Sequence, residues 1–548
     1  MEDKLNLEDI TKYLKNCKNS VAPGSSGFTF DFYKFFWRDL KFHIIKTVEY
    51  AFENNKLPLS QRLGLISIIP KGNKDKRYLS NWRPLCLLNS LYKLISGALA
   101  EKIKPSLDKI INNDQKAFLP GRYIGEVVRT TYDIIQYAKE NNRTGILMLI
   151  DFEKAYDSIS FNFINKALHF FNFGPNMIKW IGILLNNFNA SINHCGNISK
   201  TFIIGRGCRQ GDPIAAYLFI LSIEILAHKL RNDPKVEGFE MGNASHLLEI
   251  YADDMTIFLE PKPEVLRKII EILDNFNNLS GLRISVSKTK AIWFGLNHNS
   301  NIKLCPDISL TWVKNFTLLG LDFDNNLESM ENNFWNKVEE IEKMLSLWFY
   351  RYLTPYGKVT IIRTLALSKL SHIALVIPNP SKQMFKRIES ILIRFLWNNK
   401  SEKVSRYDAK LPENMGGLNL PNIEKMWLAF KFSWFRRIMV TSSFWPRILL
   451  EQIFNSCGIF YNPSDLLILG PTLLTQIGKK LKNKFWNQVL TSTIDIHGGY
   501  VFCFPEKLTF SSFWHNPLIK RNNRIVKPTD FPEIVGKITF FIRAQIRL

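Results

Sequence analysis

The chain has 548 residues, of which 46% are hydrophobic and 22% are charged. This balance excludes a largely disordered chain, and at roughly 100–200 residues per domain the length predicts three or four structural units. Lysine and arginine number 72 against 49 aspartates and glutamates, which gives a net charge of +23. Such a surplus predicts a polyanionic partner, and nucleic acid is favoured over an anionic membrane surface.

The seven cysteines are odd in number and include no Cys-x-x-Cys pair. This usage predicts reduced thiols in an intracellular protein rather than a disulfide framework or a zinc site. The longest apolar stretch, Pro213 to Ala227, contains Glu224 and is too short to span a bilayer. We therefore expect no membrane partner and interpret 213–227 as a buried helix.

The first predicted elements are helices over 1–65, interrupted by a Gly/Ser/Pro break at 22–27. At the end of this region the β-branched run Leu65 to Ile69 predicts a short strand that stops at Pro70 and is followed by a polar loop. The chain thus changes from helix to strand shortly before residue 70.

The next predicted elements are a helix and a central strand. Residues 87–111 have a helical pattern that we expect to be broken or kinked at Pro105. The near-continuous apolar run 146–152 contains an aspartate near its end. This pattern is typical of a buried strand whose tip carries a functional carboxylate.

From residue 334 onward the apolar spacing of three or four residues predicts helices. We expect a break at Pro355–Gly357 and a further helix after Pro380. Basic residues interrupt the apolar stripes of the first two helices, namely Lys337, Lys343, Arg351, Lys358, Arg363 and Lys369. They predict a face that follows a nucleic-acid backbone, although for any single residue a solvated surface is the more common explanation.

Three aspartates have positions that suit catalysis. Asp151 follows the predicted central strand, and Asp253 and Asp254 occupy a predicted hairpin turn between 247–251 and 255–259. Nucleotide addition needs two Mg²⁺ ions held by carboxylates, one to activate a hydroxyl and one to hold the triphosphate. An Asp-Asp pair is also simply a good turn sequence, and on the pair alone the two interpretations have equal weight.

Further motifs surround these acids in a definite order. They are Ala22–Phe28, Ile69–Lys71, Asn81–Leu85, Gln115–Arg122, Asp151–Asp157, Gly207–Pro213, Tyr251–Asp254, Ser280–Lys290, Phe316–Leu321 and Gly416–Pro421. The set resembles the successive signature blocks of reverse transcriptases, specifically those of LINE-type (non-LTR) retrotransposons. Each motif alone is weak or moderate, whereas the ordered set is highly specific.

The resemblance implies an α+β fold with the shape of a right hand, in which fingers and a palm with an antiparallel sheet are followed by a helical thumb. It implies an RNA-directed DNA polymerase that copies element RNA into cDNA. The domains expected from it are an N-terminal helical extension at 1–60, fingers and palm at 61–325, a thumb at 326–440 and a C-terminal segment of unknown fold at 441–548.

Metal binding is implied for the three aspartates. Asp151, Asp253 and Asp254 match the metal-binding triad of the family, and the backbone carbonyl of Phe152 is expected to add a ligand. The cofactor implied is two Mg²⁺ ions, with Mn²⁺ as a substitute. Without the surrounding motifs, these residues would not distinguish a catalytic site from a turn.

Contacts with the incoming nucleotide are implied for four residues. Lys71 and Arg83 match the residues that hold the triphosphate, although exposed basic residues in such a loop are usually only solvated. Tyr156 matches the aromatic residue that excludes a ribose 2′-hydroxyl, and a core aromatic is its alternative. Gln210 matches the glutamine that packs near the nucleotide, and its neighbour Cys208 stands where a short residue is expected.

Three further roles follow from the same resemblance. Lys288 matches the lysine proposed to protonate pyrophosphate, with Lys290 as a neighbour that could be mistaken for it. Arg122 is expected to contact the template backbone. Leu319 and Gly320 resemble the turn that holds the primer.

The implied partners are an RNA template, a DNA primer or target DNA, deoxynucleoside triphosphates and other element-encoded proteins. The expected location is a ribonucleoprotein of the nucleus and cytoplasm. A catalytically silent nucleic-acid-binding remnant is the alternative. A viral RNA-dependent RNA polymerase is disfavoured by Tyr251 and Ala252 before the paired acids, and by Tyr156.

LINE proteins usually carry an N-terminal endonuclease and a C-terminal Cys/His motif, and this sequence has neither. We therefore expect a fragment of a larger element protein or a decayed copy, and no strand-nicking activity.

Overall fold

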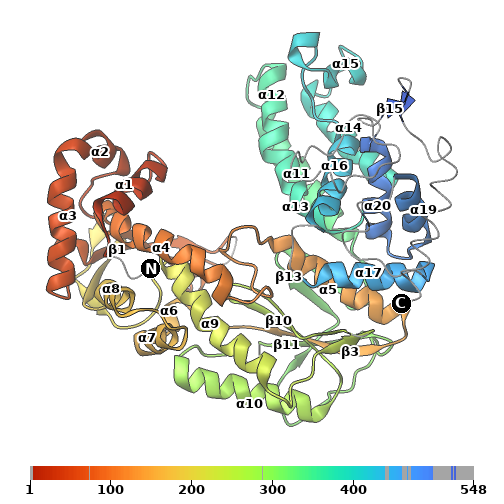
Figure 1. Cartoon of the computed structure of the whole chain (residues 1–548). Coiled ribbons are helices and arrows are strands. Elements are labelled where there is room, and N and C mark those ends of the chain that lie inside the picture. The colour runs from red at the N-terminus through yellow and green to blue at the C-terminus, as the bar shows by residue number, and fades with distance from the viewer. Residues whose placement is uncertain are drawn as a thin grey trace.

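The computed structural model describes most of the chain, namely residues 4–72, 75–242, 244–286, 288–438, 443–458, 466, 471–497, 520–521 and 524–525. In this part, the N-terminal helices and a later helical region rise on opposite sides of a central sheet, and two long helices lie beneath that sheet (Figure 1). This arrangement agrees with the predicted α+β right hand.

The N-terminal region is helical as predicted. It contains α1 (Leu7–Asn16), α2 (Phe30–Phe35) and α3 (Trp37–Glu53). The Asn6 side chain accepts a hydrogen bond from the Asp9 amide and the Asp9 side chain accepts one from the Asn6 amide, so α1 begins with a reciprocal cap. Buried residues of α1 join the same core as the palm helices.

A first sheet follows these helices. The predicted strand at 65–69 is confirmed and slightly longer, as β1 (Leu63–Pro70), which pairs antiparallel with β2 (Trp82–Leu88) and parallel with β4 (Phe188–His194). β4 in turn pairs with two short strands, β5 (Asn197–Ile198) and β6 (Phe202–Ile204). One turn of 3₁₀-helix, Leu59–Gln61, precedes β1, and another, Leu79–Asn81, precedes β2.

The second sheet is the predicted palm sheet. Its strands lie in the order β12 (Thr311–Trp312), β11 (Lys290–Gly295), β3 (Thr144–Ile150), β10 (Asp254–Leu259) and β9 (Leu248–Tyr251). All neighbours are antiparallel except β11 and β12. The predicted central strand and the predicted hairpin that carries Asp253 and Asp254 are therefore confirmed.

Both faces of this sheet are buried, which explains the continuous apolar run in β3. Ile146, Met148 and Ile150 belong to a core with α9 (Ala215–Asn232) and α10 (Pro263–Ser280). The intervening Leu147 belongs to a second core, shared with α5 (Ile124–Glu140) and the later helices. Successive side chains point to opposite faces of a strand, so each face of β3 contributes to a different core.

The remaining helices cover this sheet and its edges. The predicted helix at 87–111 is α4 (Ser90–Ile110), which begins slightly later because β2 extends to Leu88, and which continues through Pro105 without ending. The apolar stretch 213–227 is the buried helix α9, as predicted. The other elements are α6 (Ala155–Ser158), α7 (Phe161–Phe170), α8 (Pro175–Leu185), β7 (Phe239–Met241) and β8 (Ala244–His246).

The later helical region begins after a hairpin of β13 (Asn315–Leu318) and β14 (Leu321–Asp324). Its main helices are α11 (Asn332–Trp348), α12 (Pro355–Ile361), α13 (Ser368–Val376), α14 (Lys382–Leu396) and α16 (Ile423–Arg437). A π-helical turn at Ile362–Leu367 connects α12 to α13. Short helical segments follow at Arg406–Lys410 and Glu413–Met415. The break near Pro355 is confirmed. This proline starts α12 at the first helical position, which needs no backbone N–H.

One helix in the described part, Pro355–Val376, is long and apolar enough to cross a membrane by length and composition. Its side chains Ile362, Leu370 and Ile373 are buried in the second core, packed with α11 and α16. This packing accounts for its apolar character as that of a core helix.

The described part of the C-terminal segment adds α17 (Trp445–Cys457), α19 (Pro471–Lys480) and α20 (Lys484–His497). Their buried side chains share one core with α5 and the thumb helices, so the expected domain limit at residue 440 does not separate two cores. A short hairpin of β15 (Lys520–Arg521) and β16 (Arg524–Ile525) lies further along the chain.

A buried ion pair joins α20 to the palm. Arg129 and Asp133 on α5 are fully buried and 2.7 Å apart. Asp133 also accepts hydrogen bonds from Asn483 at 2.8 Å and from the Trp486 indole at 3.0 Å. Arg129 donates to the carbonyl of Val376 at 2.8 Å, so this one pair connects palm, thumb and C-terminal helices.

The predicted basic face of the thumb needs one correction. Lys358 is only 4% exposed, and its ammonium donates hydrogen bonds to the Leu396 carbonyl at 3.1 Å and to the Asn398 side chain. Burial lowers the pKa of Lys358, and the residue anchors the end of α14 rather than facing nucleic acid. Lys343 and Arg351 are exposed, as a basic face requires.

Candidate active site

The three aspartates lie at neighbouring strand ends of the palm sheet. Met255 of β10 pairs with Ile150 of β3, so the next positions on the two strands are Asp254 and Asp151. Asp254 also pairs with Tyr251 across the β9–β10 hairpin, which places Asp253 in the turn. The sheet register therefore brings together residues that are far apart in the sequence.

The electrostatics of these acids confirm their proximity. Burial and the charges of Asp253 and Asp151 raise the pKa of Asp254 from its ordinary 3.8 to about 6. Burial and the charge of Asp151 also raise the pKa of Asp253, against a lowering backbone hydrogen bond. Within the described part of the chain, no Lys or Arg forms an ion pair with any of the three. A cation between them would relieve this repulsion.

The donor set fits a hard divalent cation. Carboxylate oxygens are the ligands that Mg²⁺ prefers, and it commonly takes only one or two from the protein and the rest from substrate and water. No three His, Cys, Asp or Glu side chains close into a complete metal-binding group among the described residues. Part of the coordination would therefore be left to substrate oxygens.

A short antiparallel bridge holds the segment after Asp151. The Ser285 amide donates to the Asp151 carbonyl at 3.0 Å, and the Glu153 amide donates to the Arg283 carbonyl at 2.8 Å. These two bonds flank the pair of Phe152 and Ile284, so the ladder does not use the carbonyl of Phe152. The bridge therefore leaves this carbonyl unused, as the predicted role of a metal ligand requires.

The same bridge determines where the two candidate lysines lie. Lys288 is exposed, and its amide donates to the Ser285 carbonyl at 3.1 Å, directly after the bridge to Asp151. Lys290 is the first residue of β11 and pairs with Leu149 and Thr311. Lys288 is thus in a turn beside the acids, whereas Lys290 is a strand residue.

Tyr156 lies beside the catalytic turn. Its ring stacks on Phe219 with centroids 4.3 Å apart, and its buried hydroxyl has no hydrogen-bond partner among the residues that the structure describes. Burial and the charge of Asp253 raise its pKa. The ring is therefore half-buried on α9 and close to the acids, a position that is compatible with both the sugar contact and the core alternative.

The two predicted fingers residues lie on either side of the polar loop between β1 and β2. The Lys71 amide bonds to the Asn81 carbonyl at 2.8 Å and its ammonium to the Ser80 carbonyl at 2.9 Å. Burial raises the pKa of Asp157, and the charge of Lys71 lowers it by a smaller amount. Arg83 is exposed on β2 and pairs with Ile69.

Gln210 lines a cavity of about 330 Å³ between β2, β6 and the loop that precedes α9. Pro84, Cys86, Asp157 and Cys208 also line it, so the cavity joins the fingers sheet to the segment after Asp151. The Cys86 amide donates to the Gln210 carbonyl at 3.2 Å, which holds the loop against β2. Burial raises the pKa of Cys208 to about 12, as expected for a small core residue.

The sequence did not reveal what anchors this loop. Arg209 is 5% exposed and lies 3.1 Å from Asp212, and Asp212 accepts hydrogen bonds from Tyr92 at 2.7 Å and from Ser96. The Arg209 guanidinium also lies 4.0 Å from the Phe188 ring centre. The only sequence signal was that both charged residues belong to the motif Gly207–Pro213.

Arg122, the expected template contact, is held by groups of the protein itself. Only 8% of the Arg122 side chain is exposed, and its guanidinium binds Asp108 at 2.9 Å and the carbonyls of Ile111, Asn112 and Gln115. These contacts favour a structural role for Arg122 over the predicted template contact.

Leu319 and Gly320 form the turn between β13 and β14, with φ of 48° and 81°. Two successive positive φ angles give a tight hairpin, for which glycine is favoured at the second position. The turn lies at the entry to the thumb, where a primer-holding turn is expected.

The sequence of residues 69–323 matches the family described as reverse transcriptase (RNA-dependent DNA polymerase). The chain is 26% identical over 444 residues to an uncharacterized 149 kDa protein of transposon TX1 from Xenopus laevis, covering 80% of this chain and 33% of that protein. It is 23% identical over 412 residues to the Pol polyprotein of the type-2 retrotransposable element R2DM from Drosophila melanogaster, covering 73% and 37%. The chain thus spans about a third of the length of these relatives.

Similar solved structures include two of telomerase from Candida tropicalis. The complex with a fragment of telomeric RNA is 12% identical with a TM-score of 0.39, covering 77% of this chain and 68% of that one. The apo form is 13% identical with a TM-score of 0.40, covering 75% and 73%. From the family match and the retrotransposon relatives, residues 69–323 form a reverse transcriptase domain, and the chain is of the LINE (non-LTR) type.

Proposed function

We propose that this chain polymerises DNA on an RNA template, with Asp151, Asp253 and Asp254 as the metal-binding acids. The observation that carries the proposal is the group of three mutually repelling carboxylates at the ends of β3 and β10, without a basic partner in the described part of the chain. A folded protein retains such repulsion where a cation or a substrate compensates it.

The acids would hold two Mg²⁺ ions, or Mn²⁺, with the Phe152 carbonyl as a further oxygen donor. When bound, these ions activate the primer hydroxyl and neutralise the leaving pyrophosphate. The pKa of Asp254, about 6, implies that this carboxylate is largely protonated below roughly that pH and would then contribute less to cation binding.

The protein's own residues would select and orient the nucleotide. Lys71 and Arg83 carry the positive charge needed to hold a triphosphate, and Tyr156 would limit the space at the sugar 2′ position. Gln210 would pack against the nucleotide from the cavity beside β2. Lys288, exposed in the turn beside Asp151, would donate a proton to the departing pyrophosphate.

The partners that follow are an RNA template, a DNA primer or nicked target and deoxynucleoside triphosphates. The net charge of +23 supports a long contact with phosphate backbones. We also propose that the protein works as a ribonucleoprotein in the nucleus and cytoplasm.

The test is extension of a DNA primer annealed to an RNA template by the purified chain. We expect addition of deoxynucleotides that stops when EDTA removes divalent ions and resumes with Mg²⁺ or Mn²⁺. Extension only with ribonucleotides would instead identify an RNA polymerase. Tight binding of the primer–template without any extension would identify the silent nucleic-acid-binding remnant and contradict the proposal.

A further inference from the structure

The turn that carries Asp253 contains a strained residue. Ala252 has a φ of 58°, in the left-handed region, and is 5% exposed. This conformation is unfavourable for an alanine, because it brings the Cβ atom too close to the following carbonyl oxygen. A non-glycine residue holds it only where neighbouring groups fix its backbone.

The side chain of Gln115 provides that fixation. Its Oε1 accepts hydrogen bonds from the amide of Ala252 at 3.0 Å and from the amide of Ala117 at 2.9 Å. Its Nε2 lies 3.5 Å from the Ala252 carbonyl and donates to it. Gln115 is only 1% exposed, so one buried amide engages both polar groups of the residue before Asp253.

Backbone bonds hold Gln115 itself against the sheet edge. The Ile250 amide donates to the Asp114 carbonyl at 2.9 Å, and the Lys116 amide donates to the Ile250 carbonyl at 2.8 Å. Gln115 thus lies parallel to the outermost strand β9, paired with Ile250. Its side chain reaches along that strand to the turn.

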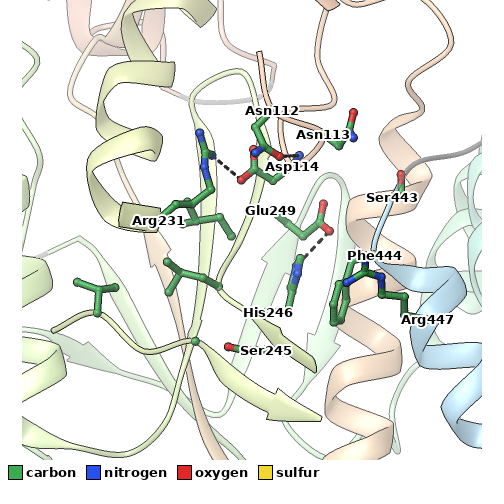
Figure 2. A pocket seen from close by; sticks show the side chains of 14 residues that line it. Asn112, Asn113, Asp114, Arg231, Ser245, His246, Glu249, Ser443, Phe444 and Arg447 are labelled. Atoms are coloured by element: carbon green, nitrogen blue, oxygen red, sulfur yellow. Dashed lines mark hydrogen bonds and ion pairs between the residues drawn. The ribbon is translucent and has the colours of Figure 1, made fainter. Parts of the chain in front are cut away.

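Largely buried side chains hold the same segment from its other side. Arg231 of α9 lies 2.6 Å from the Asp114 carboxylate. Figure 2 shows this pair beside Glu249 of β9, whose carboxylate lies 3.2 Å from His246. The segment is therefore held from both sides, by β9 and by α9.

We propose that Gln115 is a positioning residue for catalysis, which holds the strained Ala252 turn and thereby aims Asp253 at the metal site. The inference rests on the polymerase function proposed above. Gln115 does not touch substrate. It acts through the backbone of Ala252, and a small displacement of this turn would move a metal ligand.

The test compares two buried amides. Gln115→Met keeps the length of the side chain and removes both hydrogen-bonding groups. Asn325→Leu is the matched control, because Asn325 is also buried and donates at 3.0 Å to a backbone carbonyl, that of Trp293 on β11 of the same sheet. Both variants lose a buried amide, and only one of them adjoins the catalytic turn.

In single-nucleotide extension we expect Gln115→Met to lower kcat by ~10- to 100-fold, as displacement of a catalytic ligand does. Its KM for the nucleotide and its affinity for primer–template should stay within about twofold, because neither contact involves Gln115. Asn325→Leu should retain kcat. Adding Ala252→Gly to Gln115→Met should recover part of the loss, because glycine adopts positive φ without strain.

A second measurement does not depend on turnover. The rise in melting temperature on adding Mn²⁺ should be present in the wild type and in Asn325→Leu, and reduced in Gln115→Met. An active wild type with equal kcat and equal Mn²⁺ response in Gln115→Met would overturn the role of Gln115 alone. A wild type that neither extends primers nor responds to Mn²⁺ would contradict the polymerase function itself, and the positioning role with it.

Discussion

Aspartates occur in two contrasting settings in this protein. Asp133 on α5 is fully buried and is neutralised by Arg129 at 2.7 Å, with further hydrogen bonds from Asn483 and Trp486. Burial raises the pKa of Asp133 and also those of Asp253 and Asp254 at the strand ends, but Asp253 and Asp254 have no basic partner among the residues described. The acid that contributes to packing therefore has a complete set of partners, whereas the acids of the candidate metal site lack a positively charged partner among the residues described.

The contrast separates stability from function. A buried acid with a complete set of partners stabilises the junction of three regions, and losing any partner leaves a charge uncompensated. Clustered acids without a counterion destabilise the empty protein, and this instability is removed on binding a cation. Substitutions at the two places should therefore have opposite effects on the stability of the metal-free protein.

The largest effect should come from breaking the buried pair. Asp133→Ala leaves Arg129 charged and buried, which we expect to reduce the free energy of unfolding by ~3–5 kcal/mol. Urea denaturation would measure this loss. If Asp133→Ala were no less stable than wild type, the pair would not connect the palm with the C-terminal helices.

The second-largest effect should come from Tyr156, the proposed contact with the nucleotide sugar. Removing the ring in Tyr156→Ala should open space for a 2′-hydroxyl and reduce the preference for deoxynucleotides on the order of tenfold or more. The ratio of kcat/KM for the deoxy- and ribonucleotide measures it. An unchanged ratio would leave Tyr156 as a core residue stacked on Phe219.

A smaller effect concerns Asp254 and pH. Its pKa is higher in the folded state, about 6, than the 3.8 of the ordinary group, so folding favours the protonated form and stability from this group is lost as pH rises between these values. Asp254→Asn should therefore melt at a higher temperature than wild type at pH 7.5 without metal, and the difference should vanish near pH 4. A lower melting temperature at pH 7.5 would mean that the carboxylate has a partner.

The smallest effect is expected from substitutions on the thumb surface. The predicted basic face there is smaller than expected, because Lys358 is buried. Neutralising Lys343, Arg351 and Lys369 together should shorten the products made per binding event. It should also reduce the salt dependence of primer–template affinity by roughly one unit of slope for each lost phosphate contact.

The control for this prediction neutralises three exposed lysines elsewhere, Lys46, Lys166 and Lys303. Product length and salt slope should then be nearly unchanged. Equal behaviour of the two sets would show that the thumb face makes no special contact with the duplex.

Local sequence patterns predicted the elements that define the palm. The apolar run at β3 and the Asp253–Asp254 turn depend on neighbouring residues alone, and the sheet register then brings Asp151 beside them. Contacts of a side chain with a distant part of the chain leave no such pattern in the local sequence. The burial of Lys358 depends on the end of α14, and that of Arg122 on the carbonyls at 111–115.

Gln115 illustrates the same limit within the active site. It belongs to a motif that was visible in the sequence, but its contact with Ala252 requires the segment 114–116 to lie along β9. The C-terminal helices were missed as part of the thumb core for a similar reason, because Asn483 and Trp486 reach Asp133 only in the folded chain.

The most direct test of the account is the rate of single-nucleotide addition by Asp253→Asn at saturating primer–RNA template. Losing one metal ligand should reduce the rate by roughly a thousandfold or more, while RNA affinity stays close to wild type because the phosphate contacts are unchanged. Metal-free stability at pH 7.5 should be equal to or above that of wild type. Extension by Asp253→Asn near the wild-type rate would contradict the assignment of these acids as the polymerase site.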